Sequence, residues 1–211
     1  MSITERKYFD TELNASAIVA TAASWANTEL DPAALTLFYP SQGTDFNNRI
    51  GRKVQVKSLK LRGHVNVPSQ TNQGLADSAS LIRCILVMDK QTNSTQLNGE
   101  DVISSGAGSV PINMFQNPAF FGRFRVLKDK RWTLQNPNFS WDGTNLEQQG
   151  MVFKFEWTIK FRKPLYIHYN STNGGTVADI IDNSFHILAL TTSADLLPTL
   201  NYKCRTTFID I

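Results

Sequence analysis

The chain has 211 residues and a formal net charge of +3, with 21 Lys and Arg residues against 18 Asp and Glu residues. That length is enough to bury one core, and all-β domains of this size usually form a single domain. No apolar run is long enough to span a bilayer, and the first residues carry charges where a signal peptide has an apolar stretch. These features exclude a membrane-spanning helix and predict synthesis in a reducing cytoplasm.

The two cysteines, Cys84 and Cys204, lie in apolar, strand-like runs. Two such residues cannot form the framework of a disulfide-stabilised domain. We therefore expect both to be buried free thiols.

The first 48 residues are expected to form an N-terminal arm or extended segment, ahead of a β domain over residues 49–211. Residues 13–25 are rich in Ala, a pattern that fits a short helix or an extended arm equally well. Asp31-Pro32 and Tyr39-Pro40 end this segment, because the residue before a proline avoids helical backbone angles.

A strand is expected from Arg52 to Val67. Val54 and Val56 alternate with polar residues, but Leu59 and Leu61 no longer keep the same parity. One extra residue in a strand shifts every later side chain to the other face, so this slip predicts a β-bulge near Ser58.

The next segments also read as strands, with one short helix between them. Residues 81–88 are apolar at nearly every position, which predicts a strand buried on both faces. Residues 98–105 fit a short helix capped by Asn98 and ended by Gly106 and Gly108. A further strand is expected within residues 120–134.

The clearest strand runs from Met151 to Arg162, where aromatic and aliphatic residues alternate with polar ones over five repeats. It is expected to continue past Pro164 through residues 165–169. Three more strands are predicted at residues 176–181, 185–191 and 200–209. About eight strands joined by turns define an all-β fold, a sandwich or jelly roll with one or two short helices.

No enzyme signature is present. The sequence lacks the glycine-rich phosphate loops and the serine nucleophile elbow, and His64, His168 and His186 are scattered among strands without a metal-ligand spacing. Asp89, Asp101 and Asp142 could join a structural calcium site between subunits, but no calcium-loop spacing supports one. We therefore expect no enzyme activity, no cofactor and no metal site.

Positive charge is concentrated in three short segments, residues 49–62, 123–131 and 154–163. They hold 15 of the 21 basic residues and only 2 of the 18 acidic ones. If these strands are neighbours, one surface is strongly basic and suited to a nucleic-acid backbone. The alternative, which the residues leave equally open, is a solvated sheet face whose acids come from other strands.

Four segments, in the same order as in the family, resemble capsid proteins of circular, Rep-encoding single-stranded DNA viruses, of circovirus type. Residues 42–58, with Gln42-Gly43-Thr44 and Arg49-Ile50-Gly51-Arg52, resemble the first core strand, which ends in Arg62-Gly63. Residues 83–93 resemble the second strand and its turn, and residues 122–130 the next one. Lys7-Tyr8-Phe9-Asp10-Thr11 is similar to the segment that follows the family's basic arm.

The resemblance implies a single jelly roll of two facing four-stranded antiparallel sheets, with residues 49–211 as the shell domain. It also implies about sixty copies closing into a T=1 icosahedral shell around a circular single-stranded DNA genome. Satellite plant RNA viruses have similar capsids, so the packaged nucleic acid could be DNA or RNA. The chain is then a virion protein whose partners are itself, its genome and a host receptor. The residues expected to face the nucleic acid are Arg6, Lys7, Arg49, Arg52, Lys53, Lys57, Arg123, Arg125, Lys128 and Lys130.

One feature departs from the family. Its capsid proteins usually begin with a long arginine-rich arm that binds the genome and directs nuclear import, whereas here only Arg6 and Lys7 precede the core. Either such an arm has been removed or the folded subunit binds the genome with its inner surface. The competing function is a jelly-roll carbohydrate-binding (lectin-like) module, for which Trp141 and Asn145 are the suggestive residues.

Overall fold

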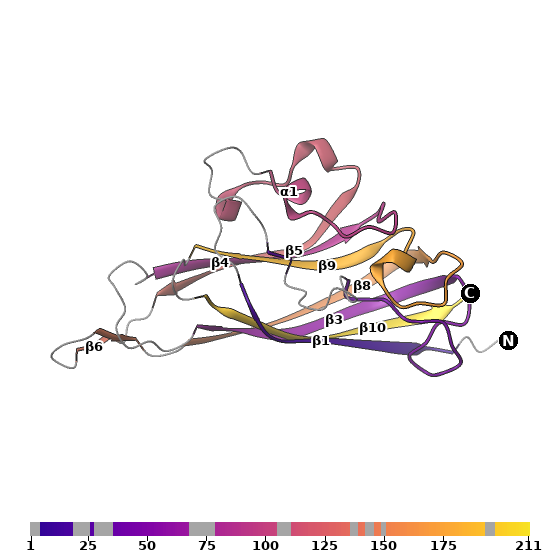
Figure 1. Cartoon of the computed structure of the whole chain (residues 1–211), viewed down its shortest axis with the longest axis horizontal. Coiled ribbons are helices and arrows are strands. Elements are labelled where there is room, and N and C mark those ends of the chain that lie inside the picture. The colour runs from indigo at the N-terminus through magenta and orange to yellow at the C-terminus, as the bar shows by residue number, and fades with distance from the viewer. Residues whose placement is uncertain are drawn as a thin grey trace.

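Two antiparallel sheets lie face to face in the computed structural model (Figure 1). The structure describes residues 5–18, 26–27, 36–67, 79–104, 111–135, 139–141, 146–148, 151–192 and 197–211. The first sheet has the order β1-β10-β3-β8, formed by β1 (Lys7–Ala17), β10 (Thr199–Asp210), β3 (Lys53–Val67) and β8 (Met151–His168). The all-β class and the two-sheet architecture are therefore confirmed.

The second sheet has the order β2-β9-β4-β5, but only three of its members are full strands. These are β9 (Ser184–Thr191), β4 (Ala79–Asp89) and β5 (Phe124–Gln135), whereas β2 (Ala26–Asn27) contributes two residues. A separate short hairpin pairs β6 (Phe139–Trp141) with β7 (Leu146–Gln148). The second sheet therefore reaches the expected four strands only when the two-residue strand β2 is counted.

The strand pairs are nested along the chain. β4 pairs with β5, β3 with β8, β2 with β9 and β1 with β10, and successive pairs alternate between the two sheets. A long hairpin wrapped round itself produces this order, which is consistent with a jelly roll. One consequence is that β5 and β8 are the outer strands of the two sheets on the same side of the sandwich.

The alternation predicted for β8 is confirmed. Phe155 and Trp157 are buried between the sheets, while Glu156 and Thr158 are exposed on the outer face. The strand also continues past Pro164 to His168, as expected.

The predicted bulge lies at Lys57. Val56 pairs with Phe208 and Leu165, and Ser58 pairs with Thr207 and Lys160, so Lys57 has no partner on either side. Because of this one extra residue, Val54 and Val56 before the bulge and Leu59 and Leu61 after it all point into the core. The other face therefore keeps the polar side chains of the whole strand.

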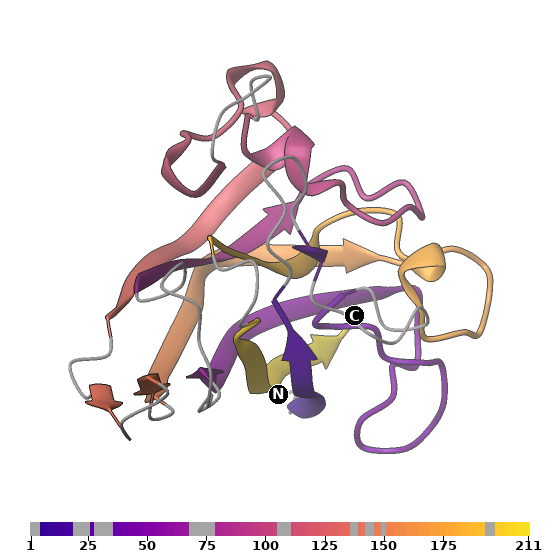
Figure 2. The same cartoon turned by 60° about the vertical axis from the view of Figure 1, so that its left-hand side comes forward.

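β4 is buried on both faces, as its continuous apolar run predicted. Ile82 and Cys84 face the first sheet, while Ile85 and Val87 belong to a second cluster on the opposite face. The connection between β4 and β5 supplies the other half of that cluster, and Figures 1 and 2 both show it lying over the second sheet on the side away from the first. It contains the helix α1 (Gly99–Val102) and two 3-10 turns, η2 (Pro111–Asn113) and η3 (Pro118–Phe120).

The predicted cap of α1 is present, since the Asn98 side chain accepts a hydrogen bond from the Glu100 backbone N–H. The helix is shorter than expected and ends at Val102, and the glycines at 106 and 108 lie outside the described residues.

Residues 7–17, within the expected N-terminal segment, form a full strand of the first sheet, since Phe9 and Leu13 are buried in the core and the backbone pairs with β10. The strand expected at residues 176–181 is wrong. Residues 176–181 are not a strand but contain the 3-10 turn η4 (Val177–Asp179). Asp179 accepts hydrogen bonds from the Thr176 backbone N–H and hydroxyl, and such local side-chain bonds favour a turn over a sheet ladder.

Candidate nucleic-acid interface

Two of the ten expected contact residues are buried and bind their own chain. Arg49 is fully buried, and its guanidinium donates to the carbonyl oxygens of Pro40, Gly51 and Thr172 at 2.8–3.2 Å while lying 4.4 Å from the centre of the Tyr169 ring. Burial lowers the pKa of Arg49, although this group keeps its charge at any pH a protein tolerates. It therefore holds loops together and does not belong to an accessible basic surface.

Lys7 is the second buried cation. Its Nζ is 3.0 Å from both the Asp210 carboxylate and the Asn48 carbonyl oxygen, and its side chain is 4% exposed. These bonds attach the first strand to the end of the last one, so the Lys7 side chain is engaged within its own chain.

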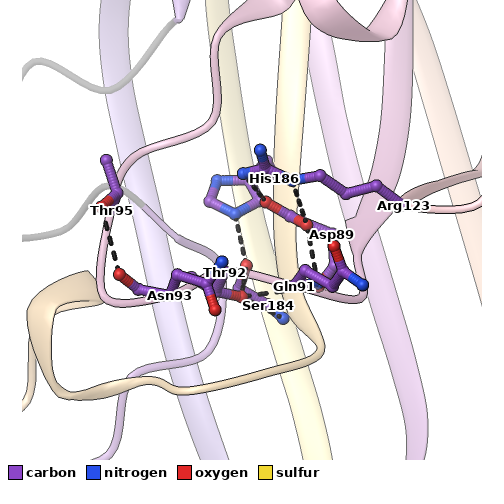
Figure 3. Close-up of polar contacts among 8 residues, drawn as sticks. All are labelled: Asp89, Gln91, Thr92, Asn93, Thr95, Arg123, Ser184 and His186. Carbon is purple, nitrogen blue, oxygen red and sulfur yellow. Dashed lines mark hydrogen bonds and ion pairs between the residues drawn. The ribbon is translucent and has the colours of Figure 1, made fainter. Parts of the chain in front are cut away.

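Arg123 is likewise engaged, in a bidentate pair with the fully buried Asp89 (Figure 3). Nε donates to Oδ1 at 3.0 Å and Nη2 to Oδ2 at 2.8 Å. The hydrogen bonds that its guanidinium donates to the Asp89 carboxylate raise the pKa of Arg123. A buried carboxylate needs such a partner. Arg123 therefore stabilises the contact between the end of β4 and the start of β5.

Figure 3 also shows a buried chain of polar groups next to this pair. The hydroxyls of Thr92 and Ser184 are 2.6 Å apart, and the Ser184 hydroxyl is 2.7 Å from Nε2 of His186. All three residues are fully buried, which leaves a substrate no access to the hydroxyls. These hydrogen bonds connect the turn after β4 to the start of β9, and we assign no catalytic role to the three residues.

Four cations on the outer face of the first sheet form salt bridges. Arg205 pairs with Asp10, Lys203 with Glu12, and Lys60 and Arg62 with Glu156, at N–O distances of 2.6–3.2 Å. A shallow hollow of about 600 Å³ in this face is lined by charges of both signs. Two of the three basic segments are neighbours here, and Glu156 of β8 pairs with both Lys60 and Arg62 of β3. The β1 acids Asp10 and Glu12 pair instead with Arg205 and Lys203 of β10, which lie outside the three segments.

Three of the expected residues project from β5 toward the first sheet. Arg125, Lys128 and Lys130 are exposed and lie opposite Met88, Leu86 and Cys84 of β4. Residues paired across an antiparallel ladder point to the same face, and those β4 residues face the core between the sheets. Because β5 is an outer strand, its cations emerge at the open side of the sandwich, next to β8.

A cleft of about 430 Å³ lies between these two outer strands and is called the edge cleft below. Its basic side chains are Arg125 of β5 and Lys160, Arg162 and Lys163 of β8, and all four are exposed. Its apolar lining includes Leu127, Ile159 and Leu165.

The strand geometry explains why the β8 cations gather there. Residues 161–164 have no partners in β3, because Val56 pairs with Leu165 and Ser58 with Lys160. Pro164 lies in this irregular stretch, where its missing N–H costs no ladder bond. Arg162 and Lys163 of this irregular stretch line the cleft. On β3, the only residue opposite residues 161–164 is Lys57, which is the bulged residue.

The other predicted residues lie elsewhere. Arg6 and Arg52 are exposed near the end of the sandwich where β1 and β3 begin. The Lys53 ammonium lies 4.2 Å from the centre of the Tyr166 ring, and Lys57 donates to the Gln55 side chain at 2.8 Å. Lys128 and Lys130 follow Arg125 along β5 but do not line the edge cleft. The structure brings Arg125 together there with Lys160, Arg162 and Lys163, which belong to a predicted basic segment but not to the predicted site. The signal that could have found them is the density of cations around Pro164.

Within the described residues, no group of three His, Cys, Asp or Glu side chains could hold a metal ion, and no helix is long and apolar enough to cross a membrane. Asp142 and Asn145 lie outside the described residues, as does the side chain of Trp141. Cys84 and Cys204 are buried free thiols as expected, and desolvation raises the pKa of Cys204 to about 12.

Comparisons with known proteins found no matching family model and no matching curated relative. Solved structures with weak similarity include several from viruses. A chain of the Cucumber Leaf Spot Virus structure has a TM-score of 0.36 at 10% identity over 98% of this chain, which spans 57% of that chain's length. The decameric BFDV capsid protein has a TM-score of 0.29 at 11% identity, with 99% and 98% of the two chains covered. The 60-mer form has a TM-score of 0.28 at 10% identity, with 100% and 96% covered.

Proposed function

We propose that this chain is a capsid subunit that self-assembles into a small icosahedral shell, with sixty copies in a T=1 arrangement around a circular single-stranded DNA genome. The observation that carries the proposal is the nested strand order, combined with where the family-like segments fall in it. Residues 42–58, 83–93 and 122–130 contain the start of β3, most of β4 and the start of β5, in the order that the resemblance implies. Jelly rolls of this kind form the shells of many viruses.

Exposed apolar side chains support self-association. Phe46, Ile50, Ile181 and Ile211 are each at least 45% exposed and lie in or beside the loops at the end of the sandwich where β3 begins and β10 ends. Phe115, in the β4–β5 connection, is 85% exposed. Large apolar side chains in fixed exposed positions mark protein–protein contacts.

Closed shells need subunit contacts between different surfaces of the same chain. Loops and sheet edges of a jelly roll provide several such surfaces, and the nested order leaves β1, β5 and β8 as outer strands. The protein would then belong to the virion, with its own copies and the packaged nucleic acid as partners.

Size measurement tests the shell directly. Purified protein is examined by size-exclusion chromatography with light scattering and by negative-stain microscopy across a range of concentration and salt. We expect hollow round particles near the mass of sixty 23.6 kDa chains, about 1.4 MDa. A protein that stays monomeric at high concentration under all these conditions would contradict the proposal.

Packaging is tested on the same particles. Particles purified at low salt should show a nucleic-acid absorbance ratio, and the extracted cargo should be sensitive to a single-strand nuclease. Digestion with DNase or RNase separates a DNA genome from an RNA one. Particles that form normally but contain only protein would contradict the proposal that the shell packages a genome. They would still support the proposal that the chain forms a shell.

A further inference from the structure

We propose that the edge cleft between β5 and β8 binds the sugar–phosphate backbone of a single nucleic-acid strand, without regard to base sequence. This inference rests on the proposed function, because it names the part of the shell subunit that contacts the packaged strand. It replaces the broad basic surface expected from the sequence by one groove whose cations come from both sheets.

The positive charge of the edge cleft is not neutralised within the described residues. No acidic side chain there forms a salt bridge with Arg125, Lys160, Arg162 or Lys163, whereas Lys60, Arg62, Lys203 and Arg205 on the outer face of the first sheet all have carboxylate partners. Four like charges gathered around a cleft with low-dielectric walls focus a positive potential. Such a potential attracts a polyanion and is relieved by it.

The positive charge of the edge cleft comes from both strands and extends along β5. Along β5, Arg125 is followed by Lys128 and Lys130 on the face turned toward the first sheet. Along β8, Lys160, Arg162 and Lys163 line the opposite side of the cleft. Cations of both strands thus line the cleft, and Lys128 and Lys130 extend the positive charge along β5 beyond it. Such an arrangement can follow successive phosphates of one strand, which is how sequence-independent single-strand sites are built.

The edge cleft also has an apolar lining. Leu127, Ile159 and Leu165 lie between the cations and offer contact to sugars and bases, while the cleft volume of about 430 Å³ is far too small for a duplex. An acidic peptide would satisfy the cations but would leave this apolar lining in contact with charged side chains. The combination therefore favours a single nucleic-acid strand.

The test compares two variants of the full chain with equal change in net charge. The cleft variant carries Arg125→Gln, Lys160→Gln, Arg162→Gln and Lys163→Gln. The control variant carries Lys60→Gln, Arg62→Gln, Lys203→Gln and Arg205→Gln, which removes four cations that already have acidic partners. Binding of fluorescent dT20 and rU20 is measured by anisotropy between 50 and 200 mM salt, with poly-glutamate as competitor.

For a single strand, each neutralised phosphate adds about 0.7 to the slope of log affinity against log salt. The cleft variant should therefore show a slope shallower by about 2.8 and, at low salt, at least a tenfold loss of affinity for both probes. The control variant should stay within about threefold of the native chain, because its cations are already paired. Poly-glutamate should compete poorly.

Equal loss in the two variants would mean that only net charge matters and would overturn the cleft. Undiminished binding by the cleft variant would overturn it as well, as would poly-glutamate competing as well as dT20, which points to an acidic peptide. Circular dichroism and thermal unfolding of both variants establish that the fold is intact. Because binding is measured on unassembled and assembled protein alike, failure to form shells would refute the proposed function without deciding the cleft.

Discussion

At the scale of single residues, the same side chain type plays two opposite roles in this protein. Arg49 and Arg52 are three positions apart, yet one is fully buried among carbonyl oxygens and the other is exposed. The difference depends on Pro40 and Thr172, which reach Arg49 only in the folded chain. A count of cations along the sequence therefore overstates the basic surface.

Replacing Arg49 tests this structural role. Arg49→Met keeps much of the side-chain volume but leaves three carbonyl oxygens without their donor, and we expect the free energy of unfolding to fall by about 3 kcal/mol. Arg52→Gln, at an exposed position, should change it by less than about 0.5 kcal/mol. Urea unfolding followed by fluorescence measures both. If Arg49→Met were as stable as the native chain, the buried guanidinium would not be what holds these loops.

Asp179 gives a residue-scale prediction for pH. Burial opposes ionisation of its carboxyl, but hydrogen bonds from Thr172 and Thr176 and the nearby charge of Arg49 outweigh burial and lower its pKa from 3.8. A carboxyl with a lowered folded pKa stabilises the fold above its unfolded pKa and loses that contribution as pH falls through the folded value.

Unfolding of the native chain and of Asp179→Asn should therefore be compared from pH 2.5 to pH 7. At pH 7 the native chain should be more stable by about 1–2 kcal/mol, and the difference should shrink below about pH 4 as the carboxylate is protonated. A difference that is constant over the whole range would show that ionisation of Asp179 contributes nothing to the turn at η4.

At the scale of elements, patterns within one strand were predictable and contacts between distant segments were not. The alternation of β8, the two buried faces of β4 and the bulge in β3 all follow from side-chain parity, which is a local property. The strand expected at 176–181 failed because Asp179 caps a turn there, a competition that apolar content does not reveal. The edge cleft was missed because β5 and β8 meet only through the pairing order of the two sheets.

Deleting Lys57 tests the bulge at this scale. Without the extra residue, either Val54 and Val56 or the apolar residues after the bulge must turn toward solvent. Exposure of two buried valines costs about 3–6 kcal/mol, so the deletion should unfold the protein or lower its stability by that amount. Lys57→Ala keeps the register and should remain folded with nearly native stability. A deletion variant as stable as Lys57→Ala would show that the register does not depend on the bulge.

At the scale of the whole molecule, the basic cleft and the exposed apolar side chains occupy different parts of the surface. The edge cleft follows the outer strands β5 and β8, whereas Phe46, Ile50 and Ile211 lie at the end of the sandwich where β3 begins. In the proposed shell, separate surfaces would allow a subunit to contact its copies and a nucleic-acid strand at once. They would also allow assembly and packaging to be disrupted independently by mutation.

Phe115 provides the sharpest test of assembly. Its neighbours are fixed, because the buried Arg83 donates to the carbonyl oxygens of Ile112 and Met114 and the Gln116 side chain donates to Phe124. The ring itself is 85% exposed, so it stands out from a rigid loop as an apolar contact ready for a second copy of the chain. Little conformational entropy is lost when a rigid contact of this kind is buried.

Phe115→Ser should therefore weaken self-association while leaving the fold intact. A central aromatic contact contributes about 2 kcal/mol or more to binding, so the concentration needed for assembly should rise at least about 30-fold, with the unfolding free energy within about 0.5 kcal/mol of the native value. Val152→Ser, which removes another exposed apolar side chain on β8, serves as the matched control and should assemble as the native chain does. Light scattering over a dilution series measures both variants. Equal weakening by the two changes would attribute assembly to general hydrophobicity, and no weakening by Phe115→Ser would place the subunit contact elsewhere.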